Sequence, residues 1–195
     1  MNKYEIDKNW FINNINNKNL IEKLQKIKVI ITDIDGCLTN ANLLVTENNI
    51  GKSFSVQDGF GTSTAIKNKL IDIAFLTGRT DEATKIRAKM LGIPDELCFT
   101  GIDQKKIAKI KAIQKLKNIT KEETLYFGDD LLDFEALDAI GVMASPENTV
   151  FYFQDYANII VPRTGGDSAF RLLLDLVLYA QNKHFAQEFI DKTIK

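Results

Sequence analysis

Acidic, hydroxyl and basic side chains follow four apolar runs of the sequence, at the point where each run ends. Asp33 and Asp35 end the run IKVIIT, Thr77 follows IDIAFL, Lys105 comes after LCFTG, and Asp129 follows ETLYFG. If the runs are parallel strands, their carboxyl ends lie at one edge of a sheet, where open α/β proteins bind their ligands. We therefore expect these side chains to share one crevice.

Crowded carboxylates in such a crevice repel one another and shift one another's pKa values unless a cation lies among them. The segment FGDDLLD adds Asp130 and Asp133 to Asp33 and Asp129. Magnesium prefers oxygen ligands of this kind and typically bridges a few carboxylates to a phosphate. The sequence therefore predicts a Mg²⁺ site with Asp33, Asp129 and Asp130 among the ligands, although Asp130 and Asp133 could instead cap a helix or support the ligands.

This set of residue types suits the hydrolysis of a phosphate ester. A carboxylate such as Asp33 can attack phosphorus and form an aspartyl-phosphate. Asp35, two residues further on, can protonate the leaving alkoxide and then activate water. Thr77 offers a hydroxyl to a phosphoryl oxygen, and Lys105 offers a positive charge for the transition state. Lys106 is the alternative to Lys105, since many lysines of this segment would simply be solvated.

The elements that position these residues alternate along the chain. Short apolar runs predict strands, and longer amphipathic stretches, such as residues 80–92 and 103–118, predict helices between them. Strands that are apolar on both faces and alternate with helices indicate an α/β fold with a doubly wound, Rossmann-like parallel sheet. Residues 40–61 depart from this alternation and predict a β-hairpin that projects as a flap.

Composition narrows the choice of partners and compartment. The 25 Lys and Arg nearly balance the 26 Asp and Glu, so nucleic acid and membrane surfaces are not expected partners. Cys37 and Cys98 lack partners at metal spacing, which favours a reducing compartment, and we expect a cytoplasmic protein without membrane spans. The single histidine, His184, lies in a polar stretch and is expected to be solvated.

We expect three regions along the chain. Residues 1–26 form an Asn-rich N-terminal extension in which Trp10 and Phe11 could dock a short helix, residues 27–183 form the catalytic domain, and residues 184–195 form a C-terminal tail.

The ordered motifs DIDGCLT, LTGR, a lysine and GDDLLD resemble those of the haloacid dehalogenase superfamily of phosphohydrolases. The short segments between the motifs leave no room for a cap domain, and within the superfamily the chain looks like the capless 3-deoxy-D-manno-octulosonate 8-phosphate phosphatases. That resemblance implies magnesium held by Asp33, the carbonyl of Asp35 and Asp129. It also implies a sugar-acid phosphate substrate in lipopolysaccharide precursor synthesis, and a homotetramer in which a neighbouring subunit closes the site.

By the same resemblance, the residues that line the substrate site come from the segment FSVQDG and from the first helix after LTGR. They are Ser55, Val56, Gln57, Asp58, Gly59, Gly78, Arg79, Arg87 and Lys105. Surface ion pairs would explain Arg79 and Arg87 about as well.

Three departures from the family's pattern concern the substrate. Gln57 stands where Arg is common, Ser63 where a basic residue is frequent, and residues 165–168 read GGDS where GGRG is usual. Fewer cations weaken the recognition of a sugar acid. An acylneuraminate 9-phosphate is therefore the alternative substrate.

Two functions from other classes fit the sequence less well. A response-regulator receiver also carries a phosphorylated Asp with Thr and Lys nearby, but the run LCFTG ends without an Asp and the segment GDDLLD would be surplus. An inactive scaffold would keep the fold, yet retention of every motif argues against it.

Overall fold

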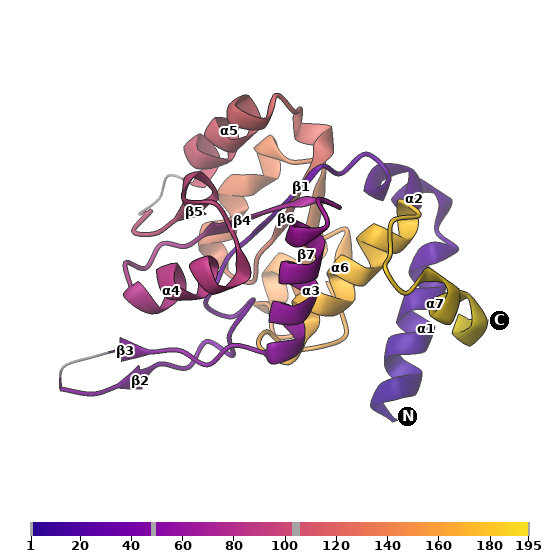
Figure 1. Ribbon diagram of the computed structural model, residues 1–195, viewed down its shortest axis with the longest axis horizontal. Helices are drawn as coiled ribbons and strands as arrows, with labels where there is room; N and C mark the ends of the chain where they lie inside the picture. Colours follow the sequence, from indigo (N-terminus) through magenta and orange to yellow (C-terminus); the bar gives the residue numbers. More distant parts are fainter. Residues whose placement is uncertain (1, 48–49, 103–105, 195) are drawn as a thin grey trace.

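Six short parallel strands form the central sheet of the protein. The computed structural model, shown in Figure 1, describes residues 2–47, 50–102 and 106–194. The strand order is β5-β4-β1-β6-β7-β8, and every pair of neighbours is parallel. The strands are β1 (Val29–Thr32), β4 (Asp72–Leu76), β5 (Cys98–Phe99), β6 (Thr124–Phe127), β7 (Val142–Pro146) and β8 (Ile159–Val161). The doubly wound parallel sheet expected from the sequence is confirmed.

The strand order places a topological switch beside β1. The chain runs from β1 to β4 and β5 on one side, then crosses to β6, β7 and β8 on the other. Thr32, the last residue of β1, pairs with Phe75 of β4 and Phe127 of β6, so these three strands end at nearly the same level. Ligands of open α/β sheets bind outside the strand ends at such a point.

Helices cover both faces of the sheet. Right-handed crossovers put α3 and α4 on one face and α5 and the 3₁₀ helix η3 on the other, because the chain reverses its direction across the sheet after β5. The α-helices are α1 (Lys3–Ile15), α2 (Lys18–Leu24), α3 (Val56–Lys67), α4 (Glu82–Leu91), α5 (Lys106–Lys117), α6 (Ala169–Ala180) and α7 (Gln187–Ile194). The 3₁₀ helices are η1 (Asp95–Leu97), η2 (Lys121–Glu123), η3 (Leu131–Ala139) and η4 (Phe151–Tyr156).

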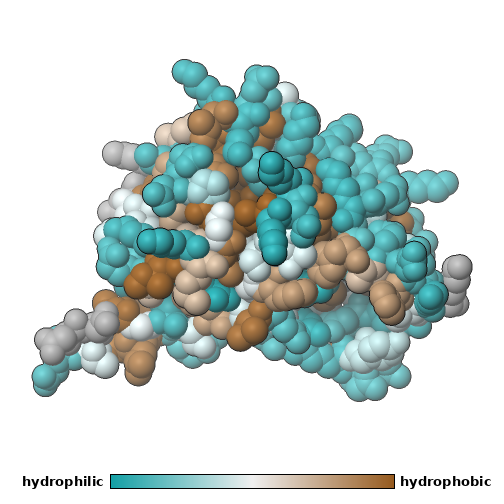
Figure 2. Space-filling model, viewed as in Figure 1, coloured by the Kyte–Doolittle hydropathy of each residue, from teal (hydrophilic) through white to brown (hydrophobic). Residues whose placement is uncertain are grey.

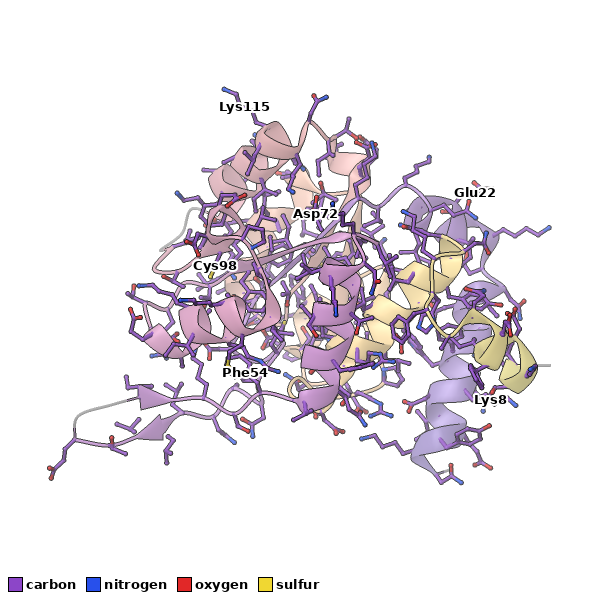
Figure 3. All side chains as sticks on the ribbon, in the orientation of Figure 1. Lys8, Glu22, Phe54, Asp72, Cys98 and Lys115 are labelled. Carbon is purple, nitrogen blue, oxygen red and sulfur yellow. The ribbon has the colours of Figure 1, made fainter. Side chains whose placement is uncertain are left out.

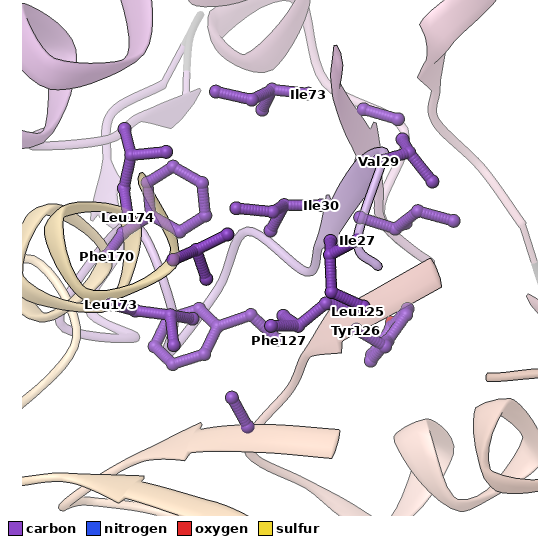
Figure 4. Close-up of a cluster of buried hydrophobic side chains, with 14 of the residues drawn as sticks. Ile27, Val29, Ile30, Ile73, Leu125, Tyr126, Phe127, Phe170, Leu173 and Leu174 are labelled. Atoms are coloured by element: carbon purple, nitrogen blue, oxygen red, sulfur yellow. The ribbon is translucent and has the colours of Figure 1, made fainter. Parts of the chain in front are cut away.

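The apolar helix α6 packs onto the middle of the sheet. Figure 4 shows Phe170, Leu173 and Leu174 of this helix facing Ile30 of β1 and Phe127 of β6. The rings of Phe127 and Phe170 have centroids 5.9 Å apart, and both side chains are fully buried. Truncating such a side chain to Ala costs about 3–5 kcal/mol of stability. This core holds the ends of β1 and β6 in place.

A two-stranded hairpin projects from the body, as Figure 1 shows. Its strands β2 (Leu44–Val45) and β3 (Ile50–Gly51) are antiparallel, with Val45 opposite Ile50, while residues 48–49 of the expected turn lie outside the described residues. Leu44 and Val45 are 70% and 69% exposed, and Figure 2 shows hydrophobic side chains on this part of the surface. The predicted hairpin is therefore present and presents apolar residues to its surroundings.

The N-terminal segment is helical and packs against the sheet domain. A capping box between Asn2 and Glu5 begins α1, and Phe11 is buried against the ring of Tyr179 in α6, with centroids 5.3 Å apart. The Trp10 indole donates a hydrogen bond of 2.7 Å to the carbonyl of Ile160 in β8. None of the helices in the described ranges is long and apolar enough to cross a membrane.

His184 is buried, contrary to the expectation of a solvated side chain. Its Nε2 lies 2.9 Å from Asp175 Oδ1, and its ring stacks on Phe185. Asp175 also accepts hydrogen bonds from Arg171 Nε at 2.7 and 2.8 Å. The polar sequence around His184 hid this role, because its partner Asp175 lies nine residues earlier, on α6, and no local pattern links the two.

Candidate active site

The carboxyl ends of β1, β4 and β6 bring Asp33, Thr77 and Asp129 to one edge of the sheet. The amide of Asp33 continues the ladder by donating to the carbonyl of Phe127 at 2.9 Å, and the amide of Thr77 donates to Phe99 at 3.0 Å. Asp33 and Thr77 are buried, and Asp129 is half-buried. Hydrogen bonds to the neighbouring strands therefore hold the backbone of Asp33 and Thr77 in place.

Lys106 is the first residue of α5, and its side chain is buried in this site. Its Nζ lies 3.0 Å from Asp33 Oδ1 and 2.5 Å from Asp133 Oδ1, and Lys106 is only 3% exposed. Burial disfavours its charge, but the carboxylates of Asp33 and Asp133 outweigh burial and raise the pKa of the Lys106 ammonium. Lys105, to which this contact was assigned from the sequence, lies outside the described residues, and Lys106 fills the position.

Asp133 holds the residues of the site in place through hydrogen bonds. Its Oδ1 accepts from Lys106 and from the Tyr126 hydroxyl at 2.6 Å, and its Oδ2 accepts from the amides of Asp129 and Asp130 at 2.8 and 3.1 Å. Its side chain is 1% exposed. Four donors on one buried carboxylate fix both the lysine and the loop that carries Asp129.

Three carboxylates gather closely enough to hold a cation. One oxygen each of Asp33, Asp129 and Asp133 lies within 4.8 Å of the others. Burial and repulsion from Asp133 raise the pKa of Asp33 to about 7, although Lys106 acts in the opposite direction. Burial and repulsion from Asp33 and Asp133 raise the pKa of Asp129 to about 8. A divalent ion would remove this repulsion, so the donor set fits the oxygen chemistry of magnesium.

The backbone next to these carboxylates also leaves room for them. Gly36 has a φ of +93°, and a Cβ there would lie 1.9 Å from Asp129 Oδ2. The glycine of the Asp-x-Asp-Gly motif is therefore required both by its conformation and by the carboxylate it faces.

Asp130 does not join this group. Its side chain is exposed and caps η3 by accepting from the amide of Leu131 at 2.6 Å. A capping role was one of the two alternatives that the sequence left open, and the structure brings Asp133, not Asp130, to the other carboxylates.

Asp35 lies on the rim of the same site and contacts two cations. Lys52 Nζ lies 2.9 Å from Asp35 Oδ2, and Arg79 Nε lies 3.6 Å from the same oxygen. The amide of Arg79 also donates to the Thr77 hydroxyl at 3.3 Å. Arg79 is therefore brought to the site as predicted, whereas Lys52 was missed.

The segment predicted to line the substrate site begins α3 and is closely packed. Ser55 caps the helix, and its carbonyl accepts from Arg87 Nη2 at 3.0 Å. Figure 3 labels Phe54 at the base of the hairpin, below α4, and the Arg87 guanidinium lies 5.5 Å from the centre of this ring. A Cβ on Gly59 would lie 2.2 Å from Arg87 Nη2. Arg87 thus ties α4 to this segment.

The other members of the segment differ in their surroundings. Gln57 accepts a hydrogen bond from the hydroxyl of Ser168 at 2.7 Å, and Asp58 accepts from the amide of Arg171 at 2.7 Å. Burial raises the pKa of Asp58 to about 6. Val56 is 83% exposed and points away from the core, and around Gly78 there is space for a Cβ without a close contact.

The sequence favoured Lys105 over Lys106 and gave no role to Lys52, for different reasons. Lys106 could have been preferred from helical spacing, because Ile110 and Ile113 follow it at i+4 and i+7 and are fully buried, which puts Lys106 on the inner face of α5. Lys52 carried no such signal, since it lies in a short hairpin whose contacts are made with Asp35 and with α4.

Comparison with known proteins gives a consistent picture. No protein-family model matches the chain. A 3-deoxy-D-manno-octulosonate 8-phosphate phosphatase from Haemophilus influenzae is 35% identical over 83% of this chain and 88% of its own length. A HAD superfamily hydrolase of subfamily III A from Legionella pneumophila superposes with a TM-score of 0.81 at 32% identity, over 91% of this chain and 94% of that one.

A third similar structure contains bound ligands. The 3-deoxy-D-manno-octulosonate 8-phosphate phosphatase from Moraxella catarrhalis, solved with magnesium, phosphate and the sugar acid, superposes with a TM-score of 0.80 at 29% identity. The alignment covers 92% of this chain and 99% of that one. A parallel sheet whose strand ends carry an Asp-x-Asp pair, a threonine, a buried lysine and further carboxylates defines a phosphohydrolase of the haloacid dehalogenase superfamily. Within it, the chain belongs to the family of 3-deoxy-D-manno-octulosonate 8-phosphate phosphatases.

Proposed function

We propose that this protein is a Mg²⁺-dependent phosphatase that hydrolyses 3-deoxy-D-manno-octulosonate 8-phosphate to the free sugar acid and phosphate. The observation that carries the proposal is the position of Asp33, which is buried at the end of β1 with Lys106 Nζ 3.0 Å from one oxygen and the carboxylates of Asp129 and Asp133 nearby. Family membership and the magnesium and sugar acid bound by the Moraxella relative support it.

In the first half of the reaction, an oxygen of Asp33 attacks phosphorus and the bond from phosphorus to the sugar oxygen breaks. Asp35 gives a proton to the departing oxygen, and Thr77 and Lys106 bind the phosphoryl oxygens. In the second half, Asp35 takes a proton from a water molecule that attacks the aspartyl-phosphate, which releases phosphate and restores Asp33. Magnesium held by Asp33, the carbonyl of Asp35 and Asp129 would neutralise the phosphoryl charge.

The segment at the start of α3 is proposed to select the substrate. Gln57 and Ser168, two of the positions that depart from the family's pattern, contact each other at 2.7 Å and offer polar but uncharged groups. Because this pair provides no cation for the substrate's carboxylate, an acylneuraminate 9-phosphate, the phosphate of another keto sugar acid, is the second candidate substrate. Arg79 is partly exposed, and its Nε lies 3.6 Å from Asp35 Oδ2, so it offers the substrate a cation beside the proposed acid.

We further propose that a second copy of the chain covers the hairpin within a homotetramer and closes the site. Leu44, Val45 and Ile50 of the hairpin are exposed, and Ile86 and Met90 of the adjoining helix α4 are 59% and 69% exposed. Exposed apolar residues that adjoin one another are typical of protein interfaces. Size-exclusion chromatography with light scattering tests the assembly.

We also propose that residues 27–183 carry catalysis, with residues 1–26 and 184–195 as flanking segments. Both cysteines are free thiols, which supports a reducing, cytoplasmic compartment. Family membership supports a role in lipopolysaccharide precursor synthesis.

A phosphate-release screen with magnesium tests the function. The panel contains 3-deoxy-D-manno-octulosonate 8-phosphate, an acylneuraminate 9-phosphate, hexose phosphates and nucleotides, and a preference for the eight-carbon acid is expected. Asp33→Asn should abolish turnover and keep the fold, while Asp72→Asn, at a partly exposed carboxylate paired with Lys117, is the matched control. Turnover by Asp33→Asn at the wild-type rate would exclude the mechanism, and preference for the nine-carbon acid would select the alternative substrate.

A further inference from the structure

A buried lysine at the base of the hairpin contacts the rim of the active site. Lys52 follows β3 directly, and its side chain is 0% exposed. Its Nζ lies 2.9 Å from Asp35 Oδ2, 2.7 Å from Asp81 Oδ2 and 3.3 Å from the Thr84 hydroxyl. Desolvation makes a fully buried ammonium expensive unless its donors are used. Here the partners come from the loop after β1 and from the start of α4.

Asp81 compensates the charge of this lysine. Its side chain is 5% exposed, and its other oxygen caps α4 by accepting from the amide of Thr84 at 2.7 Å. Burial alone would raise the pKa of Asp81, but the hydrogen bonds from Lys52 and Thr84 lower it, so the carboxylate stays ionised. Because Asp81 neutralises the ammonium, Lys52 presents Asp35 with a directed N–H donor more than with an added net charge.

The two oxygens of Asp35 consequently differ. Oδ2 is held by Lys52 and approached by Arg79, whereas Oδ1 is buried and has no hydrogen-bond partner among the described residues. We propose that Lys52 is a positioning residue that fixes the Asp35 carboxylate through Oδ2, so that Oδ1 exchanges the proton with the leaving oxygen and then with water. This inference rests on the proposed function, because it assigns Asp35 the acid and base role given there.

The proton balance is simple under this assignment. The proton on Asp35 Oδ1 passes to the sugar oxygen as its bond to phosphorus breaks, and Oδ1 then takes a proton from the attacking water. Lys52 keeps its own protons in both halves. A displacement of about 1 Å at a reacting group can cost about 100-fold in rate, so loss of the N–H contact should slow the steps that need Asp35.

The leaving group provides the test. An alkoxide needs the proton from Asp35, whereas 4-nitrophenolate leaves without one. In the first half of the reaction, a defect that acts through Asp35 is therefore confined to alkyl phosphates, while the second half needs Asp35 for both substrates. We expect Lys52→Met to lower kcat for the sugar-acid phosphate by about 10- to 100-fold. The rate constant for formation of the covalent intermediate from 4-nitrophenyl phosphate is measured from the burst of nitrophenolate. In Lys52→Met this rate constant should change less than about threefold.

A second variant guards against misfolding. Lys52→Met leaves Asp81 buried without its partner, which is costly, so the double variant Lys52→Met/Asp81→Asn removes both charges while Asn still caps α4. It should unfold near the wild-type urea midpoint and show the same selective loss. Lys85→Met is the matched control, because Lys85 pairs with Glu82 on the exposed side of α4 and is 50% exposed.

Asp35→Asn completes the design. In that background, Lys52→Met should cause no further loss with the sugar-acid phosphate, since a residue that acts through Asp35 has nothing left to position. Equal losses on both substrates, unchanged rates, or additive losses with Asp35→Asn would each overturn the inference. If the screen selects another alkyl phosphate, the same variants are measured with it, so a wrong substrate and a wrong role for Lys52 give different results.

Discussion

Lys106 Nζ lies 3.0 Å from Asp33 Oδ1, whereas the sequence favoured Lys105, the residue before it. The contact is buried and shared with Asp133, so the lysine is held between the proposed nucleophile and the carboxylate that supports the loop after β6. Helical spacing puts Lys106 on the inner face of α5 with Ile110 and Ile113. Separate substitutions of Lys105 and Lys106 therefore test which lysine serves the site.

We predict that Lys106→Met lowers kcat for phosphate release by about 100-fold or more, because a positioned cation at the phosphoryl group is lost. Lys105→Met is the matched control and should stay within about threefold of wild type. Since Lys106→Met removes the buried cation that compensates the charge of Asp133, the double variant Lys106→Met/Asp133→Asn is measured beside it, with urea unfolding as the check on stability. A larger loss in Lys105→Met than in Lys106→Met would reverse the assignment.

The strands and the first half of the site were accessible from the sequence because they depend on local patterns. Buried parallel strands are continuously apolar, so a carboxylate such as Asp33 or Asp129 marks the strand end directly, and the Asp-x-Asp-Gly turn fixes where Asp35 lies. The roles of Lys52 and Asp133 depend on partners far along the chain, and no periodicity encodes them. His184 was misjudged for the same reason, because its environment comes from α6.

Magnesium binding should release protons near neutral pH. The pKa values of Asp33 and Asp129 are raised to about 7 and about 8 in the metal-free site, so both carboxylates are largely or partly protonated at pH 7, and a bound ion holds them ionised. We expect between about one and two protons released per ion at pH 7, and fewer above pH 8. Titration calorimetry in two buffers of different ionisation enthalpy measures this number, and the absence of proton release at pH 7 would contradict it.

The same shifts set the sign of a stability effect. Both pKa values lie above the unfolded value of 3.8, so the metal-free folded chain binds more protons than the unfolded chain across about pH 4 to 8. Its stability should therefore fall as pH rises through this window, and saturating magnesium should flatten the fall. Urea unfolding at several pH values with and without magnesium measures both curves.

Asp58 should destabilise the fold above its own pKa. Burial raises that pKa from 3.8 to about 6, so ionisation of the carboxyl costs stability between about pH 4 and pH 6, and the cost persists above. Asp58→Asn keeps the acceptor for the Arg171 amide and should be about 1–3 kcal/mol more stable than wild type at pH 7, with the gain vanishing near pH 4. Asp72→Asn, at a carboxylate that is 43% exposed, is the control, and its stability should differ little from that of wild type.

The turn that carries the proposed catalytic residues is supported by a second glycine. Gly165 packs so closely on this turn that a Cβ would lie 1.8 Å from the carbonyl oxygen of Gly36, and the loop is fixed there by Asn148, which accepts from the Gly165 amide and donates to the Gly36 carbonyl. Gly165→Ala must therefore move backbone against backbone. We expect about 100-fold lower kcat and about 1–3 kcal/mol lower stability.

Gly51→Ala is the matched control for this substitution. A Cβ on Gly51 would meet Leu44 Cβ at 3.6 Å, an ordinary contact, so activity and stability should stay near wild type. Phosphate release and urea unfolding are measured for both variants. A displaced Gly36 would also shift Asp129, whose Oδ2 occupies the space beside it, and so would lower kcat. If Gly165→Ala lost stability but kept its kcat, the loop would support the fold without holding the Asp-x-Asp-Gly turn.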